Sequence, residues 1–300
     1  MSQPATPDPS DEVAAAFERL RPRLIGVAYG LLGTLGEAED AVQEAWLRLQ
    51  RSDVETIDDL TGWLVSTTSR IAIDVLRSAR VRREAYVGPW LPEPIETVDD
   101  PADSVGLADT LSWAMMVVLE TLGPAERAAF VLHDVFGLPF TEVGVVLGRT
   151  PASCRKLASR AREHVRARQP RFDVDPESHR EVVEAFAATA MSGDVDGLLD
   201  VLAPDAVLTA DGGGVVPAAL EPIPGAHVVA RFLAATLGST EFASSRITVI
   251  NGLPALLTVD VAMVRTVITL GIRNGRIVTI DAVRNPYKLR RLRSSGAVAS

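Results

Sequence analysis

Hydrophobic residues recur at helical spacing through the first third of the chain. The apolar positions fall three or four residues apart, and polar side chains occupy the opposite side of each repeat. Glycines and a polar loop at residues 52–59 divide this pattern into three segments. We therefore expect a helical domain over residues 11–86, preceded by a disordered tail at residues 1–10. The predicted helices are residues 11–31, 37–51 and 60–84.

Prolines replace the helical pattern over residues 87–108 and indicate a linker. Proline cannot donate a backbone hydrogen bond and does not continue a helix, so this stretch is expected to be stiff and extended. The run from Trp90 to Pro94, with the sequence WLPEP, places a tryptophan and a leucine in this segment. Because an exposed Trp–Leu pair is unusual, we expect the linker to dock onto a neighbouring domain.

Helical spacing returns over residues 109–170, and this second domain ends in a helix-turn-helix pattern. An apolar repeat at residues 139–147 stops at Gly148, where glycine takes a positive φ without strain. Thr150 and Pro151 then suit the cap and the first position of a second helix. This second helix is strongly basic, which suits the DNA major groove, although a cationic helix face can also be only solvated.

Runs of β-branched residues and Asn-Gly turns predict an α+β domain over residues 175–290, followed by a flexible tail at residues 291–300. Asn-Gly between two such runs is a strong hairpin signal, and it occurs at residues 251–252 and 274–275. We expect helices packed on a curved antiparallel sheet. The predicted helices are residues 179–191, 195–202 and 227–237, and the predicted strands are residues 207–210, 246–250, 255–264, 266–272 and 276–283.

Composition and charge narrow the functional classes. A chain of 300 residues, 47% hydrophobic and 23% charged, allows two or three ordinary globular domains. The net charge of −9 argues against a protein that coats nucleic acid over its whole surface, but residues 77–83 and 149–171 are locally basic. The single cysteine, Cys154, excludes an intrachain disulfide and fits a reducing compartment. Without a signal pattern or a long apolar run, we expect a cytoplasmic protein with no membrane partner.

Three segments of the two helical domains resemble the sigma-70 family. Residues 37–49 (EAEDAVQEAWLRL) are similar to the helix that binds the RNA polymerase clamp. Residues 62–64 and 70–80 resemble the segment that opens and reads the −10 promoter element, although Arg70 stands where many relatives carry asparagine. Residues 137–168 resemble the helix-turn-helix that reads the −35 element. Since only these two DNA-facing domains are present, the chain resembles the small extracytoplasmic-function class.

The remaining motifs resemble a subgroup of that class with a SnoaL-like C-terminal domain. Its hallmarks appear as WLPEP at residues 90–94, DGGG at residues 211–214 and NPYKL at residues 285–289. Val215 and Tyr287 depart from the lysine and the aspartate that relatives often have at these places. We expect a regulatory contact between the C-terminal domain and another segment. Its expected residues are Trp90, Leu91, Pro92, Glu93, Pro94, Asp211, Gly212, Gly213, Gly214, Asn285, Pro286, Lys288 and Leu289.

The resemblance implies a sigma factor that binds core RNA polymerase and promoter DNA, with no cofactor and no metal. The acidic helix face can meet the polymerase or can be only solvated, and Trp63 suits either a stacked base or the core. Polymerase binding is expected from Glu39, Asp40, Gln43, Glu44 and Trp46. DNA binding is expected from Arg77, Arg80, Arg82, Arg83, Arg149, Arg155, Lys156 and Arg160.

The acid–base residues of the C-terminal domain do not define a catalytic site. Asp205, Asp211, His227, Asp260 and Asp281 are scattered, and no metal cluster, phosphate loop or nucleophile–base motif accompanies them. We therefore expect a non-enzymatic regulatory domain, with a small molecule or a protein as its ligand. Two alternatives stay open: a regulator that binds DNA without polymerase, and a SnoaL-like cyclase or isomerase fused to a DNA-binding unit.

Overall fold

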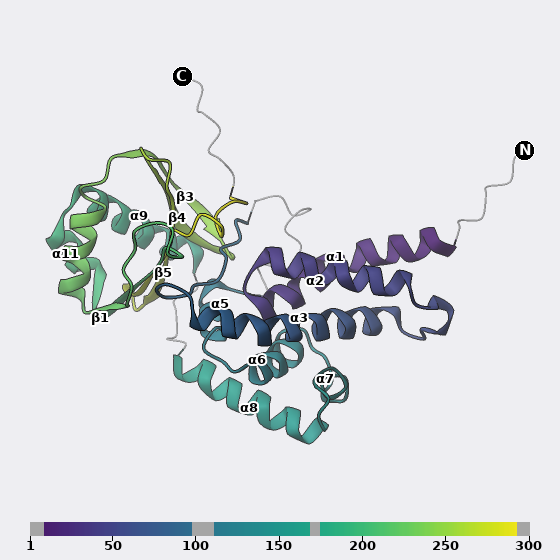
Figure 1. The fold of residues 1–300 in the computed structure, drawn as a ribbon. Coiled ribbons are helices and arrows are strands. Elements are labelled where there is room, and N and C mark those ends of the chain that lie inside the picture. The colour runs from purple at the N-terminus through teal and green to yellow at the C-terminus, as the bar shows by residue number, and fades with distance from the viewer. Residues whose placement is uncertain (1–8, 98–110, 169–174, 293–300) are drawn as a thin grey trace, which may run out of the picture. The chain divides into compact units, whose positions relative to one another are not determined.

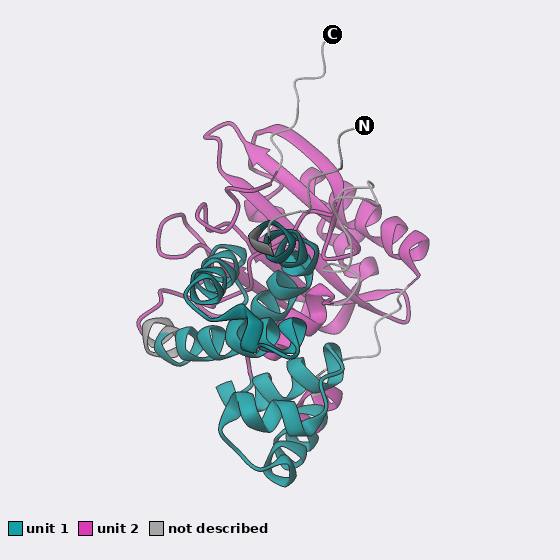
Figure 2. Cartoon of the chain, turned by 90° about the vertical axis from the view of Figure 1, so that its right-hand side faces the viewer, with its two compact units in different colours: residues 1–79, 105–107, 122–162 teal, residues 80–104, 108–121, 163–300 magenta. Residues whose placement is uncertain are grey.

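The computed structural model describes residues 9–97, 111–168 and 175–292, and the chain divides into two compact units (Figure 2). Unit 1 consists of residues 1–79, 105–107 and 122–162, and unit 2 consists of residues 80–104, 108–121 and 163–300. The described part of unit 1 is helical, whereas unit 2 combines helices with a six-stranded sheet.

The first domain has the three long helices that the hydrophobic spacing predicts (Figure 1). Gly33 follows the first helix with a φ of 78°, a conformation that glycine adopts without strain. The core between the first two helices includes the buried side chains of Leu24, Val42 and Leu49. The helices are α1 (Pro9–Leu32), α2 (Leu35–Gln50) and α3 (Leu60–Glu84), and one 3₁₀ turn at Val54–Thr56 precedes α3.

The predicted helix-turn-helix forms in unit 1. Gly148 takes the left-handed conformation with a φ of 63°, and the Thr150 hydroxyl accepts a hydrogen bond from the amide of Ser153 at 3.2 Å. A Cβ atom added to Gly144 would lie 2.7 Å from the carbonyl oxygen of Arg149, so the tight turn requires glycine there as well. The helices are α6 (Pro124–Phe130), which continues into a π turn at Val131–Val135, α7 (Phe140–Leu147) and α8 (Pro151–Arg168).

The C-terminal domain is the predicted α+β fold, with helices packed on a sheet of strand order β2-β1-β6-β5-β4-β3 (Figure 1). The sheet is mixed, which corrects the expectation of a wholly antiparallel sheet, because β1 runs parallel to β6. The strands are β1 (Leu202–Asp211), β2 (Ile223–Pro224), β3 (Phe242–Ile250), β4 (Leu253–Asp260), β5 (Arg265–Arg273) and β6 (Arg276–Val283). The helices are α9 (Pro176–Ser192), α10 (Val195–Val201) and α11 (Ala226–Thr236).

Both predicted Asn-Gly hairpins are confirmed. Asn251 and Gly252 have φ values of 47° and 82°, and Asn274 and Gly275 have values of 53° and 70°. Two consecutive positive φ angles match the right-handed twist of paired strands, and few residues other than asparagine and glycine tolerate them. These turns therefore fix the pairing of β3 with β4 and of β5 with β6.

The sheet buries apolar side chains on both faces. Leu208, Ile268 and Ile280 lie in a core with α9, α10 and α11, which cover the first face. On the second face, alternate residues such as Leu257 and Val267 form a separate cluster. This second cluster also contains Leu91 of the linker, Leu289 and Leu292 near the end of the described chain, and Trp113 of α5 (Trp113–Leu119).

The helix α5 belongs to unit 2 together with the C-terminal domain. Trp113 is buried against the sheet, and its indole Nε1 donates a hydrogen bond to the Asp281 carboxylate at 3.0 Å. Helical spacing reports that one face of a helix is buried, but it does not report the surface that covers this face. No helix within the described residues has the length and apolar content of a membrane span.

Candidate functional sites: a linker clamp, two cavities and a basic helix

The carboxylate of Asp211 lies at the centre of a buried polar cluster in unit 2, which we call the linker clamp: Tyr86, Leu91, Asp211, Asn285 and Lys288. Asp211 ends β1 and is fully buried. Its Oδ1 accepts a hydrogen bond from the Tyr86 hydroxyl at 2.5 Å, and its Oδ2 accepts one from the Leu91 amide at 3.0 Å. Lys288 Nζ lies 2.6 Å from the same Oδ2. Both carboxylate oxygens thus have donors, which offsets the cost of burying the charge.

Lys288 binds the linker in two further ways. Its ammonium group donates a hydrogen bond to the Leu91 carbonyl and lies 3.3 Å from the centre of the Trp90 ring. A cation over an indole face is stabilised by the ring quadrupole, more strongly when water is excluded. Asn285 donates its side-chain amide to the Tyr86 hydroxyl at 2.8 Å. Burial and the hydrogen bond to Asp211 raise the pKa of Tyr86, so its phenol remains a proton donor.

The three glycines that follow Asp211 allow this close approach. A Cβ atom on Gly212 would lie 2.3 Å from the Val216 carbonyl oxygen, and one on Gly213 would lie 2.4 Å from the side-chain nitrogen of Asn285. Gly213 and Gly214 also have φ values of 65° and 70°, which disfavour other residues. The DGGG motif is therefore a tightly packed turn.

The far end of the linker extends the edge of the sheet. Glu96 pairs with Ile250 in an antiparallel bridge, and the Thr97 amide donates to the Val249 carbonyl at 2.9 Å. The Glu96 carboxylate accepts hydrogen bonds from Arg246 and Thr248, each at 2.6 Å. Since β3 is the edge strand, this segment covers backbone groups that would otherwise be open to pairing.

The linker motif WLPEP and the two C-terminal motifs thus lie together in unit 2. The side chains at the two departures from relatives do not take part in the clamp. Val215 and Tyr287 are exposed. Tyr86 was absent from the predicted contact, and its aromatic ring four residues before Trp90 was the available signal. The other motif residues are buried or partly buried except for exposed Pro286 and Gly214: Trp90, Leu91, Pro92, Glu93, Pro94, Asp211, Gly212, Gly213, Asn285, Lys288 and Leu289.

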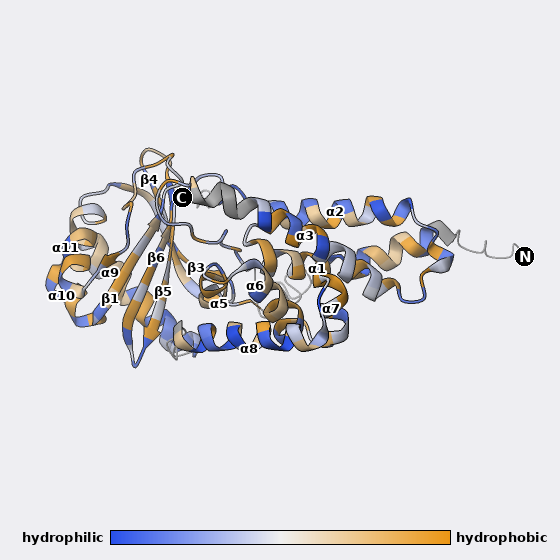
Figure 3. Cartoon of the chain, turned by 60° about the horizontal axis from the view of Figure 1, so that its bottom comes forward, coloured by the Kyte–Doolittle hydropathy of each residue, from blue (hydrophilic) through white to orange (hydrophobic). Residues whose placement is uncertain are grey.

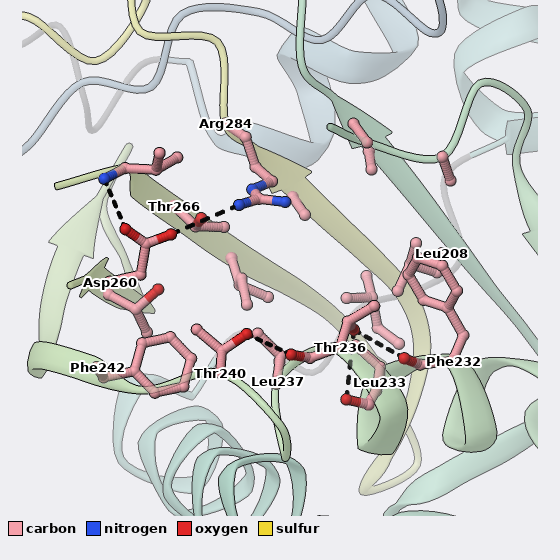
Figure 4. A pocket seen from close by; sticks show the side chains of 18 residues that line it. Leu208, Phe232, Leu233, Thr236, Leu237, Thr240, Phe242, Asp260, Thr266 and Arg284 are labelled. Atoms are coloured by element: carbon pink, nitrogen blue, oxygen red, sulfur yellow. Dashed lines mark hydrogen bonds and ion pairs between the residues drawn. The ribbon is translucent and has the colours of Figure 1, made fainter. Parts of the chain in front are cut away.

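A cavity of about 80 Å³ lies between α11 and the first face of the sheet (Figure 4). Its lining is mainly apolar, with threonine hydroxyls and one charged pair. Asp260 Oδ2 lies 4.0 Å from Arg284, whose Nη1 donates to the Pro217 carbonyl at 2.7 Å. Among the residues that line this cavity there is no histidine. His227 is exposed on α11, and exposed Asp205 pairs with Arg273 at 3.0 Å, so the acid–base candidates do not converge here.

A second cavity, of about 170 Å³, lies between α5 and the second face of the sheet, and His179 at the start of α9 also lines it. Asp281 and Trp113 meet at its wall, and His179 of α9 reaches it from another side. The sequence named Asp281 as a candidate but gave no reason to select His179, since a histidine in the first turn of a helix is usually exposed. Within the described residues, no group of His, Cys, Asp or Glu is arranged to hold a metal ion.

The basic helix α8 is amphipathic (Figure 3). Cys154, Ala158 and Ala161 are buried, while Arg155 and Lys156 point to solvent. Arg160 and Arg149 are exposed as well, so these four DNA-binding candidates are available on the surface of unit 1.

In the first domain, Arg77 is exposed and forms an ion pair with Asp74 at 3.2 Å. Arg70 donates a hydrogen bond to the Val145 carbonyl at 3.0 Å within unit 1, and Trp63 is half-buried. The side chains of Arg80, Arg82 and Arg83 lie outside the described part of the chain.

The acidic helix α2 presents its polar candidates unevenly. Asp40 and Gln43 are exposed, Glu39 is half-buried, and Glu44 pairs with Arg48 at 2.9 Å. Trp46 is also half-buried, and its ring centre lies 4.7 Å from that of Phe17. Part of its surface is thus used in holding α2 against α1.

Two family models and several relatives match this arrangement. The Sigma-70 region 2 model matches residues 16–82, and the Sigma-70, region 4 model matches residues 112–165. These matches define the class as a sigma-70 type transcription factor.

Full-length relatives narrow the class. The chain is 40% identical to the ECF RNA polymerase sigma factor SigJ of Mycobacterium tuberculosis over 91% of each protein. It is 42% identical to the probable ECF RNA polymerase sigma factor SigI of the same species, over 65% of this chain and 68% of SigI. The crystal structure of M. tuberculosis SigJ gives a TM-score of 0.73 at 35% identity and covers 92% of this chain and 98% of that one.

The chain belongs to the ECF family of RNA polymerase sigma factors. It is therefore a non-enzymatic transcription factor that binds core RNA polymerase and promoter DNA in transcription initiation. This confirms the resemblance drawn from the sequence motifs, and the helical regions followed by an α+β domain confirm the predicted fold class.

Proposed function

We propose that the C-terminal domain regulates this sigma factor by holding the linker that connects regions 2 and 4. A linker tied down at both ends has a shorter reach than a free one, so its attachment sets the span that the two regions can cover on a promoter. The contact that carries the proposal is the buried pair of Asp211 and Lys288, closed over Leu91. A buried polar network rigidifies a contact when it is fully satisfied.

We also propose that α8 contacts the −35 promoter element through Arg149, Arg155, Lys156 and Arg160. Their exposure beside a helix-turn-helix turn supports this assignment. Arginine recognises guanine through paired hydrogen bonds, and any of these cations can neutralise phosphates. The −10 element is assigned to the basic end of α3, with Arg77, Arg80, Arg82 and Arg83.

The polymerase contact is assigned to the polar face of α2. Asp40 and Gln43 are its most accessible members, and Glu39 and Glu44 lie on the same helix beside them. Trp46 contributes through the part of its ring that Phe17 leaves uncovered.

Run-off transcription with reconstituted core polymerase tests the regulatory proposal. The samples are the full chain, truncations after Arg168 and after Asn285, and the Lys288→Met variant. The matched control is Arg290→Met, which removes an exposed cation two residues away. We expect the truncations and Lys288→Met to change transcript yield while Arg290→Met behaves as the full chain does.

Equal yields from all samples would refute the regulation, provided that circular dichroism shows Lys288→Met to be folded. The yield of the full chain reports sigma-factor activity in the same experiment. Loss of regulation is therefore distinguishable from loss of the basic function.

A further inference from the structure

The larger of the two cavities described above, which we call the α5 cavity, has polar groups that the protein itself leaves unsatisfied. It is lined by Trp113, Val117, His179, Thr209, Thr269 and Asp281, together with further apolar side chains. All of these residues belong to unit 2. The cavity lies on the face of the sheet opposite to the α11 cavity, because Asp281 alternates along β6 with Ile280 and Ala282, which line the latter.

His179 is the first unsatisfied group. Its side chain is 4% exposed, and neither ring nitrogen has a hydrogen-bond partner among the described residues. Burial lowers the pKa of His179, and the nearby Pro254 carbonyl partly opposes this shift. That carbonyl makes no hydrogen bond of normal geometry with the ring. The imidazole is thus neutral and carries one donor and one acceptor. A buried donor or acceptor without a partner destabilises the folded chain, so a ligand that satisfies it is favoured.

Asp281 is the second such group. Its Oδ2 accepts the Trp113 indole N–H at 3.0 Å, while its Oδ1 receives no hydrogen bond from the described residues. No lysine or arginine is among the residues that line the cavity. Burial raises the pKa of Asp281 to about 6. A ligand that brings an N–H donor to Oδ1 would therefore gain a charge-assisted hydrogen bond in a site sheltered from water.

The remaining wall sets the size and shape of the ligand. The cavity volume is about 170 Å³. An engineered apolar cavity of roughly 150 Å³ accommodates benzene, so a single ring fits this volume. Trp113, Val117 and Ile250 supply apolar and aromatic surface, against which a flat ring can pack. An anion is disfavoured because it would be buried next to the Asp281 carboxylate.

We propose that the α5 cavity binds a weakly basic heteroaromatic molecule of one ring, which donates N–H to Asp281 and forms a hydrogen bond with His179. The ligand also contacts Trp113, so it connects α5 to the sheet. This inference concerns binding alone and does not depend on the regulatory proposal.

Ligand-observed NMR on the full chain tests the proposal, with 2-aminopyridine as the probe and benzoate as an anionic comparator of similar size. We expect a dissociation constant of about 0.1–1 mM for 2-aminopyridine and no detectable binding of benzoate. Asp281→Asn keeps an acceptor for Trp113 but removes the charge, and it should weaken binding about tenfold or more. Val117→Phe should abolish binding by filling the cavity.

The matched control is Asp260→Asn, which changes the α11 cavity and should leave the affinity unchanged. Thermal melting establishes that each variant is folded, and Asp281→Asn remains informative if Val117→Phe does not fold. The proposal fails if the wild-type chain does not bind 2-aminopyridine at about 10 mM. It also fails if folded Asp281→Asn binds with wild-type affinity, or if a crystal soaked with the probe contains only water bound to His179.

Discussion

The Nζ atom of Lys288 lies 2.6 Å from Oδ2 of Asp211, and the two residues are 77 positions apart in the sequence. Both side chains are buried, and the backbone of Leu91 binds to each of them. The ion pair therefore does more than connect β1 with the end of the C-terminal domain, because it also encloses a linker residue.

Removing one partner of this pair should destabilise unit 2 strongly. Lys288→Met leaves the Asp211 carboxylate buried without its cation, and the expected loss is about 3–5 kcal/mol in the free energy of unfolding. Urea denaturation followed by tryptophan fluorescence measures it. The double variant Asp211→Asn/Lys288→Met should lose much less than the sum of the single losses, since it leaves no unpaired charge. Additive losses would show that the two side chains do not interact.

Gly213→Ala should loosen the linker as well as strain the turn. Gly275 has a similar positive φ but no atom within 4 Å of an added Cβ, so Gly275→Ala reports backbone strain alone, about 1–2 kcal/mol. Gly213→Ala should cost at least about 1 kcal/mol more, because its Cβ displaces Asn285. Limited proteolysis should cleave the linker faster only in Gly213→Ala. Equal stability and equal cleavage of the two variants would contradict the predicted close contact.

The raised pKa of Asp281 should make the free energy of unfolding depend on pH. Its pKa is raised by burial to about 6 in the folded chain, so the folded state binds a proton more tightly than the unfolded state does. Its effect on stability is therefore absent below about pH 4, where both states are protonated. It becomes increasingly unfavourable as the pH rises from about 4 to about 6, and it is constant above that. The expected loss is on the order of 3 kcal/mol.

Asp281→Asn removes this dependence while it retains an acceptor for Trp113. Urea unfolding at about pH 4.5 and about pH 7.5 measures the free energy of unfolding of both proteins. The stability of the variant relative to the wild-type chain should increase between these two pH values. His179 acts in the opposite sense, since its lowered pKa makes stability fall as the pH drops below its usual pKa, and it is common to both proteins. A difference between the two proteins that stays constant with pH would contradict the assignment.

Arg155→Ala should weaken promoter binding by the holoenzyme. If Arg155 contacts a base, its loss should cost about 1–3 kcal/mol of binding free energy. If it contacts a phosphate, its loss should reduce the slope of log affinity against log salt concentration by about one. Fluorescence anisotropy at several salt concentrations separates these outcomes. The control is Arg231→Ala, which removes an exposed cation from α11 in the C-terminal domain. Unchanged promoter affinity in Arg155→Ala would refute its assignment.

Local sequence patterns were sufficient to predict the turns and hairpins, whose structure depends on residues close together in the chain. Gly148 and Thr150 define the turn before α8, and Asn251-Gly252 and Asn274-Gly275 define the hairpins, because φ preferences and caps act within a few residues. The parallel pairing of β1 with β6 was missed, since it joins strands that are far apart in the sequence. The sheet face that covers Trp113 was not predictable from the local pattern either, because its strands lie far away in the sequence.

The sequence by itself determined the helical regions, the α+β domain and, through its motifs, the sigma-factor family. It also named Asp211, Asn285 and Lys288 as members of one contact. Only the tertiary structure decided that Tyr86 completes this contact, and that His179 and Asp281 line one cavity together with Trp113. The reason is that burial and pairing of polar groups depend on chain segments brought together from a distance, and the residues near each group in sequence do not specify them.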